Sequence, residues 1–392
     1  MTNEWIALLW LLLPLAALSG WWAAWRSMKA AASEGQKRIH PEYFKGLNFV
    51  LNEQPDKAIE VFIRMLEVDS ETVETHLALG NLFRRRGEVD RAIRIHQNLI
   101  ARPSLPEDER FRALLELGMD YMSSGLLDRA ESLFKELAGT RTYAVQANHK
   151  LLEIYQQERE WDKAIDIAQK LQTLNGHNLD PEIAQFYCEL AEQNLTAGSK
   201  TVAQQHVRRA LTIDPDCIRA SLLEAENARL EGKIGLALKI LQRVEKQDPD
   251  YLPEVVAVIV ACYRELGQVD DCMHYLQHIV SKYGGMTPLL YLTRLIEETR
   301  GEKAAIAFIS QELKRRPSVR GVDKLIEYVL GMAEGEIRDN LQTIKEMTAK
   351  LLSSSPVYKC KHCGFDAKQL HWHCPSCKQW SSIKPVLGVV GE

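Results

Sequence analysis

The stretch Gly80-Asn-Leu-Phe-Arg-Arg-Arg-Gly-Glu-Val-Asp-Arg-Ala-Ile-Arg-Ile-His96 decides the fold of this chain. Its second half is a motif, Gly-x-x-x-x-Ala-Ile, in which a glycine interrupts helical sequence and a small residue follows at a fixed distance. Partial copies recur along the chain, and their small residue falls at Ala58, Ala92, Ala130, Ala164, Ala203, Ala237, Cys272 and Ala305. Neighbouring members lie 33 to 39 residues apart, with no sustained period-2 alternation between them. The pattern predicts a helical repeat.

The spacing centres on 34 residues, which is typical of the tetratricopeptide repeat. Such a repeat has two antiparallel helices, and a small side chain is needed where they approach most closely. Two further positions keep the same register, a glycine twelve residues before the small residue and a phenylalanine four after it: Gly46, Gly80, Gly118, Phe62 and Phe134. We therefore predict an all-α fold, an α-solenoid of about eight tetratricopeptide repeats over residues 39–317, followed by capping helices over 318–354.

A solenoid of this kind has a long concave surface that is lined by the first helix of every repeat and that binds peptides or proteins. In the second repeat, Asn81 and Arg84 are expected to face this groove, where they are candidates for holding an acidic segment of a partner. The alternative is that they belong to a solvated charged face of the helix.

The first 26 residues form a separate segment. From Trp5 to Trp25 there is no charged residue, and 21 residues in a helix span roughly the 30 Å of a bilayer core. Tryptophans at both ends suit the headgroup zone, so we predict a transmembrane anchor over residues 1–26. A cleaved signal peptide or a buried core helix is the alternative, but Glu4 replaces the basic residues that a signal peptide carries there. The basic linker over residues 27–38 predicts a cytoplasmic location for the rest of the chain.

Composition excludes some functions. The net charge of -4 gives no basic excess, so nucleic acid is not an expected partner. Four of the eight cysteines are scattered through helical sequence, whereas the other four fall within 18 residues, an arrangement unlike a secreted disulfide framework.

The clustered cysteines are Cys360, Cys363, Cys374 and Cys377. Two CxxC pairs can aim four thiolates at one tetrahedral ion, so residues 355–392 are predicted to be a small zinc module. We expect this module to sit at one end of the solenoid and to gain much of its folding free energy from the metal. Iron would fit the same four sulfurs and would imply electron transfer. A catalytic zinc would need an open position, and one of the nearby histidines could replace a cysteine: His362, His371 and His373.

Taken together, these features resemble the lipopolysaccharide assembly protein B family of Gram-negative bacteria. The resemblance covers the whole chain and rests on the uncharged N-terminus and on four runs: Gly80 to His96, Phe186-Tyr-Cys-Glu-Leu-Ala191, Trp372-His-Cys-Pro-Ser-Cys-Lys-Gln-Trp380 and Ser382-Ile-Lys-Pro385. It implies a single-pass bacterial inner-membrane protein with a periplasmic N-terminus. It also implies a rubredoxin-like module whose metal ligands are the four clustered cysteines.

The function implied by the resemblance is regulation of lipopolysaccharide synthesis. The chain would present the deacetylase that commits precursors to lipid A to a membrane-bound AAA+ protease, in contact with other lipopolysaccharide assembly proteins. No phosphate loop, nucleophile elbow or HExxH motif occurs in the sequence, so we expect an adaptor and not an enzyme. A scaffold without a role in proteolysis and a redox metalloprotein remain as alternatives.

Overall fold

The computed structural model describes residues 21–22, 41–68 and 73–392. The predicted anchor and the basic linker, apart from Trp21 and Trp22, lie outside the described residues. Within the described part of the chain, no helix combines the length and the apolar character needed to cross a membrane.

The chain divides into two compact units, residues 1–143 and 144–392. The first unit contains helices that pack as consecutive antiparallel pairs, each pair also contacting the next. They are α2 (Pro41–Leu51) with α3 (Pro55–Val68), α4 (Val73–Arg85) with α5 (Val89–Ile100), and α6 (Glu107–Ser123) with α7 (Leu127–Leu137).

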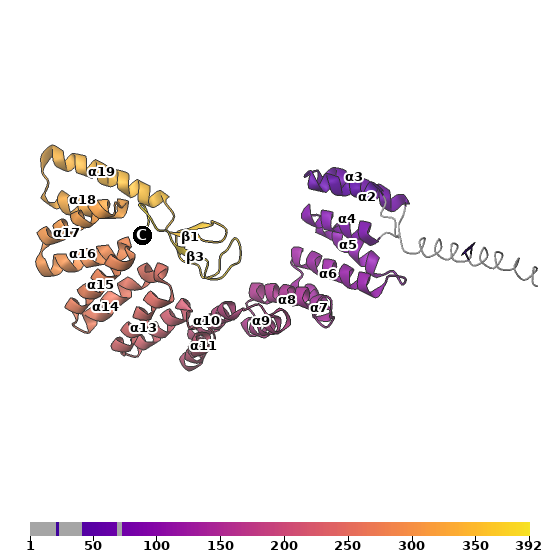
Figure 1. Ribbon diagram of the computed structural model, residues 1–392, viewed down its shortest axis with the longest axis horizontal. Helices are drawn as coiled ribbons and strands as arrows, with labels where there is room; N and C mark the ends of the chain where they lie inside the picture. The colour runs from indigo at the N-terminus through magenta and orange to yellow at the C-terminus, as the bar shows by residue number, and fades with distance from the viewer. Residues whose placement is uncertain (1–20, 23–40, 69–72) are drawn as a thin grey trace, which may run out of the picture. The chain divides into compact units, whose positions relative to one another are not determined.

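The second unit continues the same arrangement and ends in a small sheet (Figure 1). Its helix pairs are α8 (Ala144–Glu158) with α9 (Trp161–Asn175), α10 (Asp180–Thr196) with α11 (Lys200–Ile213), α12 (Ile218–Leu230) with α13 (Ile234–Gln247), α14 (Leu252–Glu265) with α15 (Val269–Tyr283), α16 (Met286–Arg300) with α17 (Glu302–Arg315), and α18 (Val319–Met332) with α19 (Gly335–Ser354). A short 3-10 turn, η1 (Pro249–Tyr251), precedes α14. The strands are β1 (Tyr358–Cys360), β2 (Asp366–Ala367) and β3 (Ile383–Pro385).

The small residue of each repeat lies in the second helix of a pair, as the motif predicts. All eight members, from Ala58 in α3 to Ala305 in α17, have an exposed side-chain fraction of at most 1 %. A larger side chain at these positions would have to displace closely packed neighbours. The final pair, α18 and α19, lacks the motif. The described part of the chain is therefore a mostly helical solenoid of tetratricopeptide-like repeats.

The glycine of the repeat register packs against the aromatic residue sixteen positions later. A Cβ atom at Gly118 would lie 2.6 Å from the ring of Phe134, and one at Gly46 would lie 2.6 Å from the ring of Phe62. In the second repeat the same aromatic position is held by His96, which is fully buried against Gly80. A histidine in the core requires polar partners, and these are found in the next repeat.

Candidate metal centre and its contact with the repeats

The cysteine module is built on a three-stranded antiparallel sheet with strand order β2-β1-β3. Cys360 ends β1, and the chain then turns so that the backbone N–H of Cys363 points at its sulfur, 3.5 Å away. Gly364 completes the first turn with φ of +78°, a conformation that glycine adopts without a Cβ clash. Lys378 follows the second CxxC pair with φ of +59°. Both CxxC pairs are therefore tight turns that hold their sulfurs on one side.

The four sulfurs converge on one point. All of them lie within 4.8 Å of one another, with Cys360 and Cys377 at 3.7 Å and Cys363 and Cys374 at 3.8 Å. A tetrahedral ion with metal–sulfur bonds of about 2.3 Å requires sulfurs roughly 3.8 Å apart, so the cysteines fit one tetrahedral metal ion. Four thiolates would fill its coordination shell. Both zinc and iron satisfy this geometry, so the predicted zinc stays a prediction.

The surroundings of the sulfurs favour at least one thiolate. Burial opposes ionisation of Cys360, but the backbone N–H of Cys363 and the hydroxyl of Ser382 outweigh it and lower its pKa to about 6. Removal from water and the neighbouring sulfurs instead raise the pKa of Cys377 to about 12. A divalent cation would remove this conflict because it attracts all four thiolates at once.

His373 does not belong to the ligand set. Its Nε2 lies 2.9 Å from the backbone oxygen of Lys378, and its ring stacks on Trp380 with centroids 4.4 Å apart. Among the described residues, the converging group consists of the four cysteines alone.

The module is not confined to the end of the solenoid, because Trp380 reaches back to α8, α9 and α10. Its ring packs edge-to-face against Trp161 and Phe186, with ring centroids 6.0 and 5.8 Å away. Its Nε1 donates a hydrogen bond of 2.9 Å to Gln156 Oε1. Trp161 and Phe186 are themselves buried in the repeats. The expectation of a module that sits only at one end of the solenoid is therefore wrong: apolar rings on both surfaces favour this contact.

A second contact joins the module to η1 and α14. The hydroxyl of Tyr251 donates to the backbone oxygen of Ile383 at 3.0 Å, and its ring stacks on Trp372 at 5.6 Å. Lys384 forms an ion pair with Asp248 at 2.6 Å. Stacking, a hydrogen bond and a partly buried ion pair hold β3 against this part of the second unit.

Trp380→Ala should separate the module from α8–α10 without removing the metal, because Trp380 contacts the repeats and is not a ligand. For a half-buried tryptophan we expect a loss of about 2 kcal/mol in the free energy of unfolding. Hydrogen exchange should rise in Gln156 to Phe186 at unchanged metal content. Trp380→Phe is the matched control, since it keeps an aromatic ring against Trp161 and Phe186 and loses only about 1 kcal/mol with the hydrogen bond. Unchanged exchange in Trp380→Ala would show that this contact does not hold the module.

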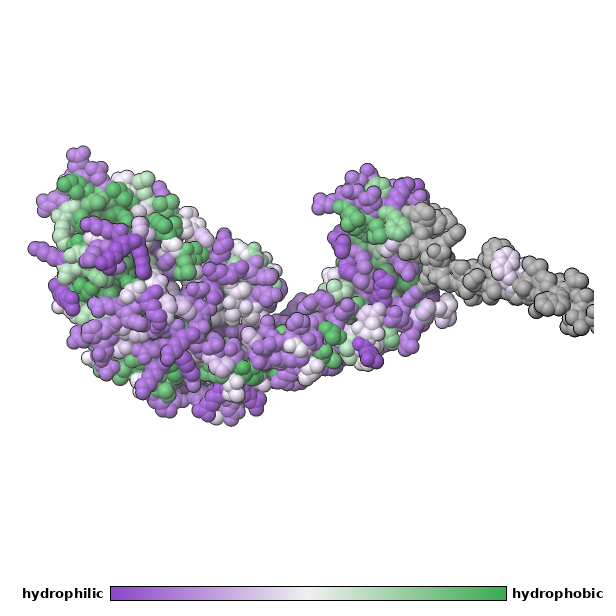
Figure 2. All heavy atoms as spheres, viewed as in Figure 1, coloured by the Kyte–Doolittle hydropathy of each residue, from purple (hydrophilic) through white to green (hydrophobic). Residues whose placement is uncertain are grey.

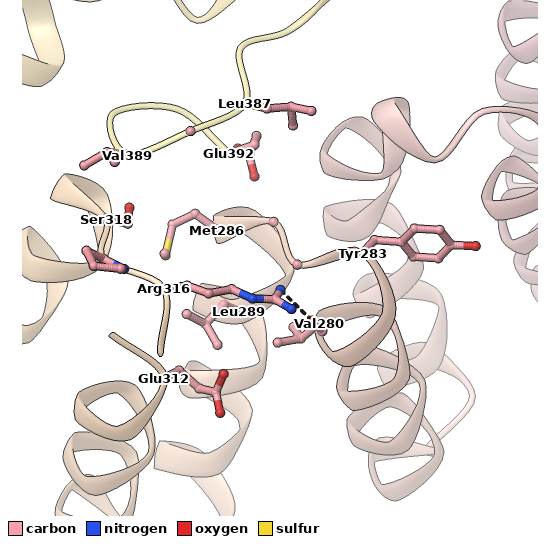
Figure 3. Close-up of a pocket in the computed structure, with 14 residues that line it drawn as sticks. Val280, Tyr283, Met286, Leu289, Glu312, Arg316, Ser318, Leu387, Val389 and Glu392 are labelled. Atoms are coloured by element: carbon pink, nitrogen blue, oxygen red, sulfur yellow. Dashed lines mark hydrogen bonds between the residues drawn. The ribbon is translucent and has the colours of Figure 1, made fainter. Parts of the chain in front are cut away.

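The C-terminal segment after β3 is fixed to the far repeats of the same unit. The backbone N–H of Thr287, at the start of α16, donates to the carboxylate of Glu392 at 2.7 Å, and Arg320 of α18 pairs with that carboxylate. A pocket of about 370 Å³ lies beside this segment, with Arg316 crossing it to donate to the Val280 backbone oxygen at 3.1 Å (Figure 3). None of the four clustered cysteines lines it, so it is separate from the metal centre.

The structure places Arg84 inside an internal network. Its guanidinium pairs with Glu116 at 2.7 Å and with Asp120 at 2.8 Å, and Asp120 also contacts His96 Nδ1 at 2.5 Å. Burial works against the charge, yet these two carboxylates raise the pKa of Arg84. Asn81 is half-buried, and its Oδ1 is shielded from solvent. The contacts of Arg84 join two repeats, and a partner role for either residue stays a prediction.

The sequence did not reveal that Trp380 meets Trp161 where the module contacts α8–α10, or that Trp372 stacks on Tyr251 at the second contact. These are the three tryptophans outside the first 26 residues. Because tryptophan is enriched where two surfaces pack, these three tryptophans could have indicated a contact between the module and the repeats.

Comparison with known proteins agrees with this architecture. Residues 358–385 match the rubredoxin metal binding domain, and residues 75–110 match the tetratricopeptide repeat. Lipopolysaccharide assembly protein B of Escherichia coli is 40% identical over 387 residues, covering 98% of this chain and 100% of that protein. The Haemophilus influenzae protein of the same name is 39% identical over 391 residues, covering 97% of this chain and 98% of its own length. The chain therefore belongs to the lipopolysaccharide assembly protein B family.

Proposed function

We propose that this chain is a membrane-anchored adaptor that limits lipopolysaccharide synthesis. It holds the deacetylase that commits precursors to lipid A beside a membrane-bound AAA+ protease, which degrades it. The observation that carries this proposal is the similarity over nearly the full length to proteins named lipopolysaccharide assembly protein B. The name indicates a role in lipopolysaccharide assembly, and the repeats supply a surface on which proteins can be held.

The metal centre supports a structural and not a catalytic role. Four thiolates leave no position for a substrate or water on a tetrahedral ion. Such a module stabilises the repeat surface that it contacts. The adaptor then acts by raising the effective concentration of two proteins near one another, and it needs no chemistry of its own.

The proposed location is the bacterial inner membrane, with one crossing, a periplasmic N-terminus and a cytoplasmic solenoid. The uncharged run from Trp5 to Trp25 and the basic residues that follow it support this orientation. Because the proposed partners act at this membrane, the anchor is part of the mechanism.

The test is the half-life of the deacetylase in a strain depleted of this chain. Depletion should lengthen that half-life, and the full chain should restore it. Residues 27–392 alone should not restore it, since without the anchor the two partners are no longer concentrated at one membrane. A control fusion joins residues 27–392 to an unrelated transmembrane helix of the same orientation. It distinguishes a need for membrane anchoring alone from a need for a specific contact made by the native helix.

Two outcomes would contradict the proposal. An unchanged half-life on depletion would favour a scaffold without a role in proteolysis. Full restoration by residues 27–392 would show that membrane localisation is not required.

A further inference from the structure

A pair of thiols lies beneath the contact between the module and the repeats. Cys188, in the middle of α10, and Cys217, the residue before α12, have their sulfurs 3.9 Å apart, and both side chains are buried. Neither residue holds the small position of a repeat, which accounts for the buried Cys272. The two residues are 29 positions apart and belong to successive helix pairs, so the solenoid fold brings their sulfurs together.

A buried amide contacts one of the two sulfurs. Gln185 Nε2 donates to Cys217 Sγ at 3.4 Å, and Gln185 Oε1 accepts from Arg219 at 3.5 Å. Because arginine can only donate, this contact decides which end of the amide faces the sulfur. Arg219 is itself buried and pairs with Glu189 and Glu192, so its position is fixed. An N–H group is therefore directed at the sulfur of Cys217.

The two thiols are not equivalent. Cys217 precedes the first turn of α12, where the helix dipole favours a negative charge, and it accepts the hydrogen bond from the amide. The hydrogen bond from the Cys188 thiol lowers the pKa of Cys217, and the same contact together with burial raises the pKa of Cys188. Cys217 is thus suited to be the attacking thiolate, and Cys188 the thiol that resolves the product.

The metal module limits access to this pair. Ser381 accepts a hydrogen bond of 3.1 Å from the same Gln185 Nε2, and its neighbour Trp380 packs on Phe186 of α10. Gln185 and Cys217 both have exposed fractions of 3%. The surface around α10 and α11 is largely hydrophilic (Figure 2), and the two sulfurs lie below it. Release of the module would open a path to Cys217, because Ser381 covers the amide that contacts its sulfur.

We propose that Cys188 and Cys217 form a reversible disulfide when hydrogen peroxide reaches them after the module leaves the repeats. The Cys217 thiolate attacks one peroxide oxygen and becomes a sulfenic acid, while the O–O bond breaks and the other oxygen leaves as hydroxide. Cys188 then attacks the oxidised sulfur, and its proton leaves with the displaced hydroxyl group as water. The first hydroxide takes up the proton that Cys217 lost on ionising. The two sulfurs lose two electrons in total, and one peroxide becomes two waters.

The new bond needs only a small rearrangement. The sulfur separation must fall from 3.9 Å to about 2.05 Å, which moves each sulfur by about 1 Å. Rotation about the two Cα–Cβ bonds changes the sulfur positions without moving the helix axes. The product ties α10 to the start of α12, and a dithiol reductant restores both thiols by exchange.

The test uses the full-length, metal-loaded chain in detergent, exposed to a small molar excess of hydrogen peroxide. The reaction is stopped with an alkylating agent, and mass spectrometry measures the linked peptides that contain Cys188 and Cys217. The native chain and Trp380→Phe should form the disulfide slowly. Trp380→Ala, and the native chain after chelation, should form it about tenfold faster or more, because thiol oxidation follows exposure. Dithiothreitol should reverse the reaction.

Three further variants, each checked for its helical melting curve, test the two roles. Cys188→Ala should leave a sulfenic acid on Cys217 that dimedone traps, whereas Cys217→Ala should leave Cys188 unmodified. Cys262→Ala removes a buried thiol outside the pair and should still form the disulfide. No Cys188–Cys217 link in the released chains, equal rates in docked and released chains, or a sulfenic acid on Cys188 in the Cys217→Ala chain would overturn the proposal.

Discussion

Loss of the metal, through Cys374→Ser or a strong chelator, should unfold residues 358–385 and release them from the repeats. A small structural zinc module gains on the order of 10 kcal/mol from its metal, and this short segment has little core of its own. The buried hydrophobic cluster of the module consists of Cys360, Cys374 and Ile383, so two of its three members are predicted ligands. We therefore expect complete local unfolding.

The effect should extend into the repeats, because the module covers part of them. Trp161 and Phe186 would lose their contact with Trp380, and Tyr251 would lose Trp372. Hydrogen exchange should rise in α8–α10 and around η1, whereas α2–α7 of the first unit should keep its protection. Metal loss should therefore reduce protection in repeats that lie far from the module in the sequence.

Metal content by mass spectrometry and local hydrogen exchange on the full chain provide the measurement. Cys272→Ala is the matched control: it also removes a buried cysteine, but at the position where the other seven repeats have alanine. It should keep one metal ion per chain. A Cys374→Ser chain that retains the metal and the protection of α8–α10 would refute the structural role. Stoichiometric iron with a reversible redox response would favour electron transfer.

Asp120→Ala should be the most damaging substitution in the first unit, at about 3–5 kcal/mol. Its carboxylate is fully buried and contacts both Arg84 and His96. Without it, the ring of His96 is left buried without its recorded Nδ1 partner, and Arg84 keeps only Glu116. Removing one member of a buried charged network leaves the others desolvated and unpaired.

The consequence can be measured by urea unfolding together with hydrogen exchange in α4–α6. Glu136→Ala removes an exposed acidic side chain from α7 of the same unit and should change stability by less than about 0.5 kcal/mol. A double-mutant cycle with Arg84→Ala should show strong coupling between Arg84 and Asp120. Additive losses, or an Asp120→Ala chain as stable as the Glu136→Ala control, would show that the network contributes little.

The helical architecture and the metal ligands could be predicted because their determinants are local or periodic. A small residue recurring about every 34 positions has the same cause in each repeat, the close approach of two helices, and Ala92 and Ala130 are fully buried as a result. The four sulfurs converge because each CxxC pair is a turn whose geometry depends on adjacent residues. In both cases the sequence carries the information within a few residues or at a fixed spacing.

Other features were decided by tertiary structure alone. Trp380 and Gln156 are 224 residues apart, and their hydrogen bond depends on how the repeats curve and where the C-terminal segment returns to them. Arg84 looked like a free cation on the groove, but α6 brings Glu116 and Asp120 to it. Sequence by itself determined the helices, their pairing and the ligand set, because those follow from local geometry repeated along the chain. Only the folded chain decided which polar groups are buried together and where the module packs, because such contacts join residues whose separation follows no period.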